Sequence, residues 1–134
     1  FTDGTPWLAM NPNYRQINVR EQEVRTDSVL AYYRRLVHLR KADAYRETFT
    51  YGIFEPAYQE MADVFAYYRV SGESGQRILV AANFGTDAVS LPLAYPCRQV
   101  LLSNLRAESA VETACEKANA LTLESCEVAV IELG

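Results

Sequence analysis

The chain has 134 residues, of which 49% are apolar, 22% charged and 11% aromatic, and its formal net charge is −4. This composition excludes disorder, collagen and coiled coil, and no apolar run reaches the ~20 residues of a membrane-spanning helix. The scattered lysines and arginines form no basic stripe, so nucleic acid is not an expected partner.

Residues 1–27 show neither a helical nor a strand period, which predicts a long loop. Loops of this length in compact domains are uncommon unless they are functional or disordered. Several side chains here are too apolar to be left in water, so we expect them to pack against another part of the protein. They are Trp7, Met10, Tyr14, Ile17 and Val19.

Residues 28–41 carry apolar side chains at helical spacing, which predicts one amphipathic helix. Its apolar face consists of Val29, Tyr33, Leu36 and Val37. Thr26 or Asp27 is the expected N-cap, and the basic pair Arg40 and Lys41 suits the negative end of the helix dipole. The opposite face, with Arg34, Arg35 and His38, is interpreted as a solvated surface.

From about Thr48 the period changes to two, which is typical of strands. Residues 63–70 and 77–84 are predicted to form a hairpin around the turn 71–75, whose glycines Gly72 and Gly75 are expected at positive φ. Further strands are predicted at 49–54, 89–93, 99–103, 120–123 and 127–133, and a loop at 106–118. The fold class is therefore mainly β, an antiparallel sandwich or Greek-key barrel preceded by an irregular loop and one helix.

No constellation of catalytic residue types stands out. His38 is the only histidine and lies in mid-helix beside arginines, so neither a metal cluster nor a Ser–His–Asp arrangement is indicated. The 17 carboxylates show no spacing that singles out an acid/base pair, and no glycine-rich phosphate loop follows a strand. We expect no catalytic residue, metal or cofactor in this chain.

The cysteines and the N-terminus bear on location. Cys97, Cys115 and Cys126 lack CxxC spacing and are interpreted as buried or free thiols in a reducing compartment. The first residues have neither the basic start nor the apolar core of a signal peptide. We therefore expect a soluble, cytoplasmic protein.

Aromatic residues are numerous enough to build a flat sugar-binding platform, since the chain has nine tyrosines and five phenylalanines. The core of a sandwich must also be filled, and inward-facing rings do that. Core residues are the favoured interpretation. Three or more coplanar, exposed rings on one sheet face would favour the platform instead.

Several sequence blocks resemble a known family. Pro6-Trp7, Asn11-Pro12-Asn13-Tyr14 and Ile17-Asn18-Val19, in this order and followed by residues 28–41, resemble the last barrel segment of glycoside hydrolase family 13 α-glucosidases. Within that family the sequence is most similar to the group of oligo-1,6-glucosidases and sucrose isomerases. Residues 51–52, 64–69, 78–84 and 101–104 resemble the β-sandwich called domain C. Residues 124–127 depart from the family's Pro-aromatic-Glu pattern.

The resemblance implies that residues 1–46 are the last loop and helix of a (β/α)₈ barrel and residues 47–134 are domain C. The family's catalytic carboxylates lie on earlier barrel strands, and no residue here matches them. A parent enzyme of this family cleaves α-1,6- or α-1,4-glucosidic bonds in oligosaccharides with retention, through two carboxyl groups about 5 Å apart. The implied role is a non-catalytic C-terminal domain that caps and stabilises the catalytic barrel of the same polypeptide.

Active sites of such barrels are built from the loops that follow the strands. Trp7, Asn11, Asn13 and Tyr14 are therefore candidates to border the outer end of a sugar pocket, and the alternative is that they anchor the loop. The apolar helix face is expected to fold onto the sandwich or to pair with a second copy. Two alternative functions stay open, a stand-alone carbohydrate-binding module and an unrelated interaction domain with the same fold.

Overall fold

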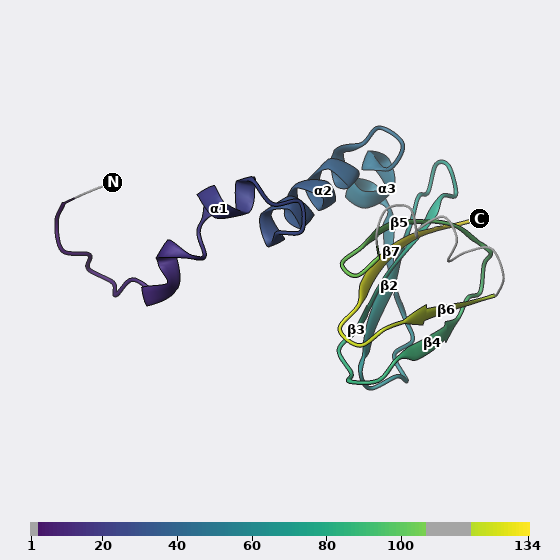
Figure 1. The fold of residues 1–134 in the computed structure, drawn as a ribbon. Helices are drawn as coiled ribbons and strands as arrows, with labels where there is room; N and C mark the ends of the chain where they lie inside the picture. The colour runs from purple at the N-terminus through teal and green to yellow at the C-terminus, as the bar shows by residue number, and fades with distance from the viewer. Residues whose placement is uncertain (1–2, 107–118) are drawn as a thin grey trace. The chain divides into compact units, whose positions relative to one another are not determined.

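The computed structural model describes residues 3–106 and 119–134 of the chain. Two compact units are present, Phe1–Arg35 and Leu36–Gly134, and Figure 1 shows their helices and strands. The predicted loop at 106–118 lies outside the described residues, apart from Arg106.

The first unit contains short helices where the sequence predicted a long loop without regular secondary structure. A 3₁₀-helix, η1, spans Pro12–Arg15, and an α-helix, α1, spans Val19–Glu23. Asparagines cap both, because Asn11 Oδ1 accepts from the Asn13 amide at 3.2 Å and Asn18 Oδ1 accepts from the Glu21 amide at 3.0 Å. The prediction was wrong because four and five residues are too few to show a hydrophobic period.

The apolar side chains of this unit remain largely exposed, although we expected them to be packed. Trp7 is 92% exposed, and Met10, Tyr14, Ile17 and Val19 are all classed as exposed. A stretch this apolar and this ordered requires a partner surface to be stable in water.

The predicted amphipathic helix is confirmed as α2, Val29–Lys41. Its cap is Ser28, in place of the predicted Thr26 or Asp27, since Ser28 Oγ accepts from the Ala31 amide at 3.1 Å. Asp27 pairs instead with Arg25 on the surface, at 2.9 Å. Val29 and Tyr33 on the predicted apolar face are exposed.

A third helix, α3, spans Arg46–Tyr51, so the strand predicted at 49–54 is wrong over most of its length. Strand β1, Ile53–Ala57, begins only after Gly52. The Gly52 amide donates to the Thr48 carbonyl at 3.1 Å, which closes the last turn of the helix. The alternation of Phe49, Tyr51 and Ile53 imitates a strand period but spans a helix end.

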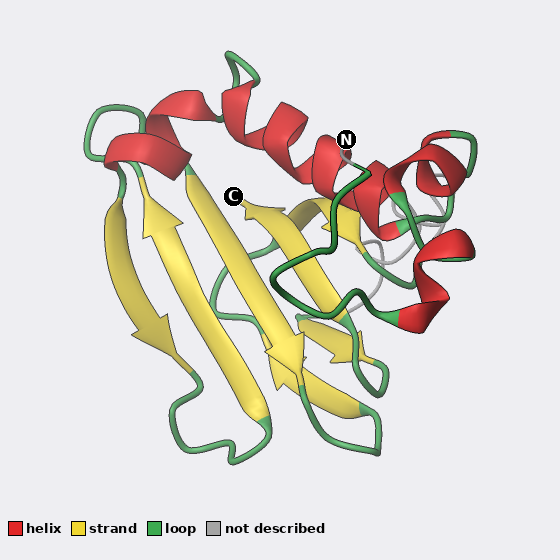
Figure 2. Ribbon diagram, turned by 90° about the vertical axis from the view of Figure 1, so that its left-hand side faces the viewer, coloured by secondary structure: helices red, strands yellow, loops and turns green. Residues whose placement is uncertain are grey.

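The other predicted strands are confirmed with small changes in their bounds. They are β2 Val64–Val70, β3 Arg77–Asn83, β4 Val89–Pro92, β5 Cys97–Ser103, β6 Ala120–Leu123 and β7 Val128–Leu133. Five strands form one sheet in the order β1-β2-β3-β7-β5, and β4 pairs with β6 in a second sheet. Every pairing is antiparallel, and Figure 2 shows the strands of the larger sheet side by side. The mainly β sandwich class is confirmed, and the described residues form two short α-helices and one 3₁₀-helix that were not predicted.

The turn between β2 and β3 confirms one of the two glycine predictions. Gly75 has φ +70°, whereas Gly72 is not in the positive region. Only the residue that reverses the chain direction before β3 requires the left-handed conformation.

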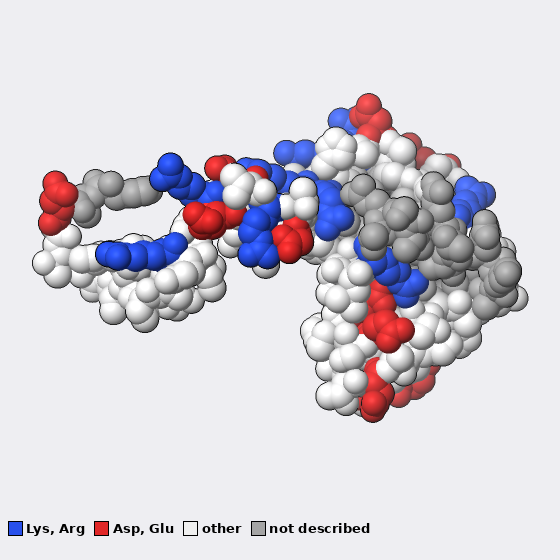
Figure 3. All heavy atoms as spheres, in the orientation of Figure 1, with Lys and Arg blue, Asp and Glu red and all other residues white. Residues whose placement is uncertain are grey.

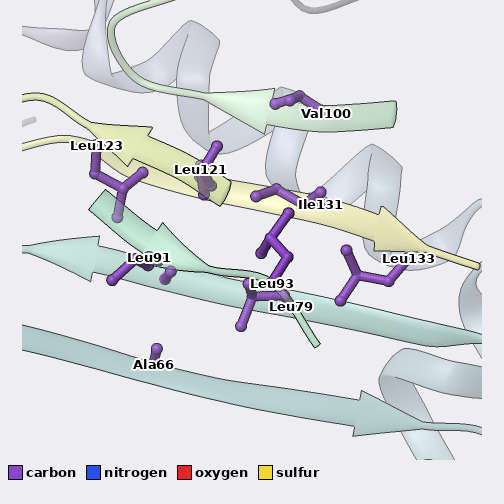
Figure 4. Close-up of a cluster of buried hydrophobic side chains, with 11 residues drawn as sticks. Ala66, Leu79, Leu91, Leu93, Val100, Leu121, Leu123, Ile131 and Leu133 are labelled. Atoms are coloured by element: carbon purple, nitrogen blue, oxygen red, sulfur yellow. The ribbon is translucent and has the colours of Figure 1, made fainter. Parts of the chain in front are cut away.

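The core of the second unit lies between the two sheets. Leu79 on β3 and Ile131 on β7 face Leu91 and Leu123 from the smaller sheet, and all four are fully buried. Figure 4 shows these side chains between the layers, together with Ala66, Leu93, Val100, Leu121 and Leu133. Each fully buried Leu or Ile stabilises the fold by roughly 1.5–3 kcal/mol, so this layer holds the sandwich together.

The cysteine interpretation is corrected at one position. Cys97, at the start of β5, is disulfide-bonded, whereas Cys126 is a free, exposed thiol as expected. Oxidation at Cys97 does not follow from the sequence spacing, because the bond depends on tertiary contact.

Candidate functional site

Three of the four sequence-predicted candidates lie together at η1, and Trp7 lies four residues before its cap. Asn11 uses its side-chain oxygen as the N-cap, which is an anchoring role. The Asn13 carbonyl accepts from the Gln16 and Ile17 amides at 2.9 Å. Through these hydrogen bonds, Asn11 and Asn13 hold the backbone of η1 in place.

The side chain of Tyr14 contacts the side chain of Arg15, the next residue in the sequence. Arg15 Nε donates to Tyr14 Oη at 3.2 Å, and the guanidinium carbon lies 5.7 Å from the ring centroid. Tyr14 nonetheless keeps 44% of its surface exposed, and Trp7 keeps more. These two rings are among the exposed apolar groups of this segment that are available for contact with another molecule or domain.

Asn18 is a structural residue that the sequence prediction missed. Its Nδ2 donates to the carbonyls of Tyr14 and Arg15, at 3.0 and 3.2 Å, while its Oδ1 caps α1. The signal was present, because Asn followed three residues later by Glu resembles a capping box. Asn18 thereby links the end of η1 to the start of α1.

A polar cluster forms around Glu132, which together with Gln76 lines a cleft of about 510 Å³ on the second unit. Gln76 Nε2 donates to Glu132 Oε1 at 3.0 Å, and Gln99 Nε2 donates to Oε2 at 2.8 Å. Tyr45 Oη donates to the same Oε2 at 3.2 Å. The residue that precedes α3, the residue that precedes β3, and strands β5 and β7 are thus joined through one carboxylate.

The electrostatics of this cluster oppose acid catalysis. Burial raises the pKa of Glu132, but the hydrogen bonds from Gln99, Gln76 and Tyr45 lower that pKa by more, so it lies below the ordinary value. Burial, together with the neighbouring Glu132, raises the pKa of Tyr45. A general acid at neutral pH needs a raised carboxyl pKa, so this cluster is structural.

The carboxylate of Glu127, just before β7, ties together strand ends at the end of β7 opposite the Glu132 cluster. It is fully buried, and it receives hydrogen bonds from Ser103 Oγ at 2.7 Å and from the Glu124 amide at 2.9 Å. Arg106 contributes two contacts, at 2.6 Å to Oε1 and 3.1 Å to Oε2. The same guanidinium also donates to the Thr122 carbonyl.

Burial raises the pKa of Glu127, but the hydrogen bonds from Arg106, the Glu124 amide and Ser103 outweigh it, so that pKa is lowered. In the part of the chain that the structure describes, each carboxyl group with a clear pKa shift is shifted downward: Asp27, Glu127 and Glu132. None of these three carboxyl groups is therefore tuned for proton donation at neutral pH.

Aromatic rings and two arginines line a shallow groove of about 400 Å³ on the second unit, which we call the aromatic–arginine groove. Its residues are Arg40, Phe49, Thr50, Phe54, Phe65, Tyr67 and Arg69. The rings of Phe54 and Tyr67 are 4.9 Å apart and tilted by 32°, and those of Phe65 and Tyr67 are 5.8 Å apart and inclined by 61°. The three rings are not coplanar, so they do not form the flat platform that sugar stacking requires.

Residues 3–106 and 119–134 contain no group of three or more His, Cys, Asp or Glu side chains that could hold a metal ion. None of the helices in these ranges combines the length and apolar character that crossing a membrane requires. Acidic and basic side chains are interspersed over the helices on the face drawn in Figure 3.

Comparison with known proteins connects the two units to one enzyme family. The family model for the alpha-amylase catalytic domain matches residues 1–52. The oligo-1,6-glucosidase of Bacillus cereus is 38% identical over 87 residues, which are 65% of this chain and 15% of that protein. The glucan 1,6-alpha-glucosidase of Streptococcus pneumoniae is 35% identical over 112 residues, which are 84% of this chain and 20% of that protein.

Solved structures match the whole chain. The isomaltulose synthase of Klebsiella sp. LX3 is 30% identical, with a TM-score of 0.82, and the match covers 100% of this chain and 23% of that one. The trehalulose synthase of Pseudomonas mesoacidophila MX-45 is 28% identical, with a TM-score of 0.81 and the same coverage. The chain thus spans a quarter or less of the length of the proteins it matches.

Proposed function

Because the chain is an oligo-1,6-glucosidase-like fragment of the alpha-amylase family, glycoside hydrolase family 13, we propose that it is the non-catalytic C-terminal part of a retaining α-glucosidase. Its role is to cap and stabilise the catalytic barrel of a longer polypeptide. The observation that carries this proposal is the structural match, which spans the whole chain but only 23% of isomaltulose synthase.

Two features of the described residues support a capping role. The carboxyl groups with shifted pKa values are all held ionised, so none is poised as a catalytic acid. The first unit exposes Trp7, Val24 and Val29, among other large apolar side chains. Surfaces of this kind on a monomer mark an interface, and the catalytic-domain match over residues 1–52 makes the rest of a catalytic domain the fitting partner.

In this proposal residues 1–46 complete the barrel with its last loop and helix, and residues 47–134 form the capping sandwich. The longer polypeptide hydrolyses α-1,6- or α-1,4-glucosidic bonds in oligosaccharides, using a carboxyl pair that it supplies itself. Trp7, Asn11, Asn13 and Tyr14 then border the outer end of its sugar pocket, with the exposed rings of Trp7 and Tyr14 as the contact groups. The cytoplasm is the proposed location.

The test compares two purified proteins on isomaltose and maltotriose. We expect the product of the complete open reading frame to release glucose and the 134-residue chain alone to release none. Glucose release by the 134-residue chain, or a complete reading frame that encodes no barrel, refutes the proposal.

Two further ideas from the sequence are tested on the 134-residue chain. A carbohydrate-binding module should give measurable heat when titrated with isomaltose or maltotriose, and the inclined rings of the aromatic–arginine groove lead us to expect none. Pairing of two copies through the apolar face of α2 should appear as a dimer in sedimentation equilibrium, and Tyr33→Glu should abolish it.

A further inference from the structure

The aromatic–arginine groove has two walls of different origin. Arg40 on α2 and Phe49 and Thr50 on α3 form one wall, and strands β1 and β2 form the other. The first wall falls within residues 1–52, which match the catalytic-domain model, and the second wall follows that match. The groove therefore lies where the chain passes from the catalytic-domain segment into the sandwich.

Strand alternation builds the second wall. Phe65, Tyr67 and Arg69 alternate along β2 with Ala66, which belongs to the core between the sheets. Phe54 on β1 is the register partner of Arg69. Phe54 and Phe65 are 51% and 56% exposed, so this part of the larger sheet carries large rings that the described chain leaves in contact with solvent.

The charges of the groove are unbalanced. Two of its seven lining residues are arginines and none is acidic. Among the described residues neither arginine has an ion pair, and Arg69 Nη2 makes only long contacts, at 3.3 Å to the Phe49 carbonyl and 3.5 Å to the Thr50 carbonyl. Arg69 Nε is buried without an acceptor. An unsatisfied buried donor is destabilising, and a carboxylate would satisfy it.

We propose that the aromatic–arginine groove docks a segment of the catalytic portion of the longer polypeptide, one that presents a carboxylate to Arg40 and Arg69 and an apolar side chain to Phe54 and Phe65. This inference rests on the proposed function and adds the contact surface to it. The chemistry of the occupant follows from the groove, because two cations lie beside exposed rings without an anion.

The same features disfavour other occupants. A sugar ring stacks on a flat platform, and these rings are inclined to one another. A symmetric dimer that used this groove would place the same patch of the two copies face to face. The arginines of one copy would then lie against the arginines of the other, and like charges repel.

The experiment measures hydroxyl-radical modification of Phe54, Phe65 and Tyr67 by mass spectrometry, in the 134-residue chain and in the product of the complete open reading frame. We expect several-fold slower modification of all three rings in the longer protein. Phe84, which is 72% exposed and lies outside the groove, is the internal control and should change less.

Charge reversal supplies a second readout. Arg69→Glu should lower the Tm of the longer protein by several degrees more than it lowers the Tm of the 134-residue chain. The matched control is Arg46→Glu, because the Arg46 side chain is 68% exposed on α3 and, among the described residues, pairs only with Asp43 at 3.8 Å. Arg46→Glu should shift both proteins equally.

Equal modification rates in the two proteins overturn the docking proposal. Protection that grows with the concentration of the 134-residue chain assigns the groove to a second copy instead, and protection that appears only with isomaltose assigns it to sugar. Each of these results leaves the capping function standing if the longer protein still releases glucose from isomaltose, so the two proposals fail separately.

Discussion

Replacement of the buried carboxylate Glu127 by glutamine tests whether charge holds the strand ends together. Glutamine keeps the shape of the side chain, but its single oxygen can replace only one of the two carboxylate oxygens, either Oε1, which accepts from Ser103, or Oε2, which accepts from the Glu124 amide. It loses the negative charge that faces Arg106, and its NH₂ group meets the guanidinium donors across 2.6 to 3.1 Å. The N–H groups of Arg106 then point at an NH₂ group that cannot accept a hydrogen bond from them.

The size of the effect follows from burial. Breaking a buried ion pair by removing one partner costs about 3–5 kcal/mol. The Arg106 side chain keeps 21% of its surface exposed and can recover some hydration, so we take the lower end. In a unit of this size each kcal/mol moves the Tm by ~4–8 °C, so a loss of about 3 kcal/mol corresponds to roughly 12–24 °C.

Thermal unfolding followed by circular dichroism, at neutral pH and matched protein concentration, measures this shift. Glu73→Gln is the control, because Glu73 lies exposed in the β2–β3 turn. Equal unfolding temperatures for Glu127→Gln and Glu73→Gln would show that the charge of Glu127 contributes nothing, and the ion-pair argument would then be wrong.

The two carboxylates Glu127 and Glu132 predict the direction in which the stability of the fold changes with pH. The pKa values of Glu127 and Glu132 are lowered in the folded chain from the ordinary 4.5. Their contribution to stability is therefore complete above about pH 4.5 and is lost as the pH falls through the lowered folded pKa values. Urea unfolding across this range should give a falling free energy of unfolding, and Glu127→Gln should flatten the slope; an unchanged slope would assign the acid sensitivity to other groups.

Three further substitutions are expected to act through the backbone, and thermal unfolding measures each. Gly52→Ala should destabilise the fold by about 1–3 kcal/mol, because its Cβ would lie 2.4 Å from the Thr48 carbonyl oxygen. Gly72 has open space around it, so Gly72→Ala is the control and should be tolerated. Equal losses of stability in the two variants would contradict the close packing at the end of α3. Asn83→Ala should cost about 2–4 kcal/mol, since Nδ2 binds the carbonyls of Asp87 and Glu124 and Oδ1 accepts from Gly85; a neutral result would show that water replaces these bonds. Cys126 has φ +58°, so Cys126→Gly should stabilise by up to about 1 kcal/mol and Cys126→Val should destabilise; the reverse order would contradict the left-handed conformation.

Sequence periodicity predicted the sandwich well because its strands are half-buried and alternate. In β2, Ala66 faces the core while Phe65 and Tyr67 face outward, and that two-residue period is visible in the sequence. The helix α2 was predicted from its period of 3.6, although none of its residues is buried against the rest of the described chain. Where an element has one continuous apolar face, the pattern is sufficient.

The failures occur where an element is short or where the decisive contact is distant in sequence. Residues 49–54 alternate like a strand, yet Thr48 is buried against Gln76 and the helix α3 forms. The pairing of Glu127 with Arg106 spans 21 positions and has no local signature. The site candidates at η1 came from a resemblance, and the structure shows how Asn11, Asn13 and Tyr14 hold the local fold through their hydrogen bonds.

The family-like blocks in the sandwich encode structure rather than chemistry. Asn83, the last residue of β3, donates to the Glu124 carbonyl. Asn104, which ends the 101–104 block, donates to the Cys126 carbonyl and accepts from the Val128 amide. Both asparagines therefore hold the same turn, residues 124–127, where the sequence departs from the family pattern. Side chains from two other strand ends fix the path of this turn, so its own residues can vary while the fold persists. A resemblance carried by such residues therefore predicts architecture rather than chemistry.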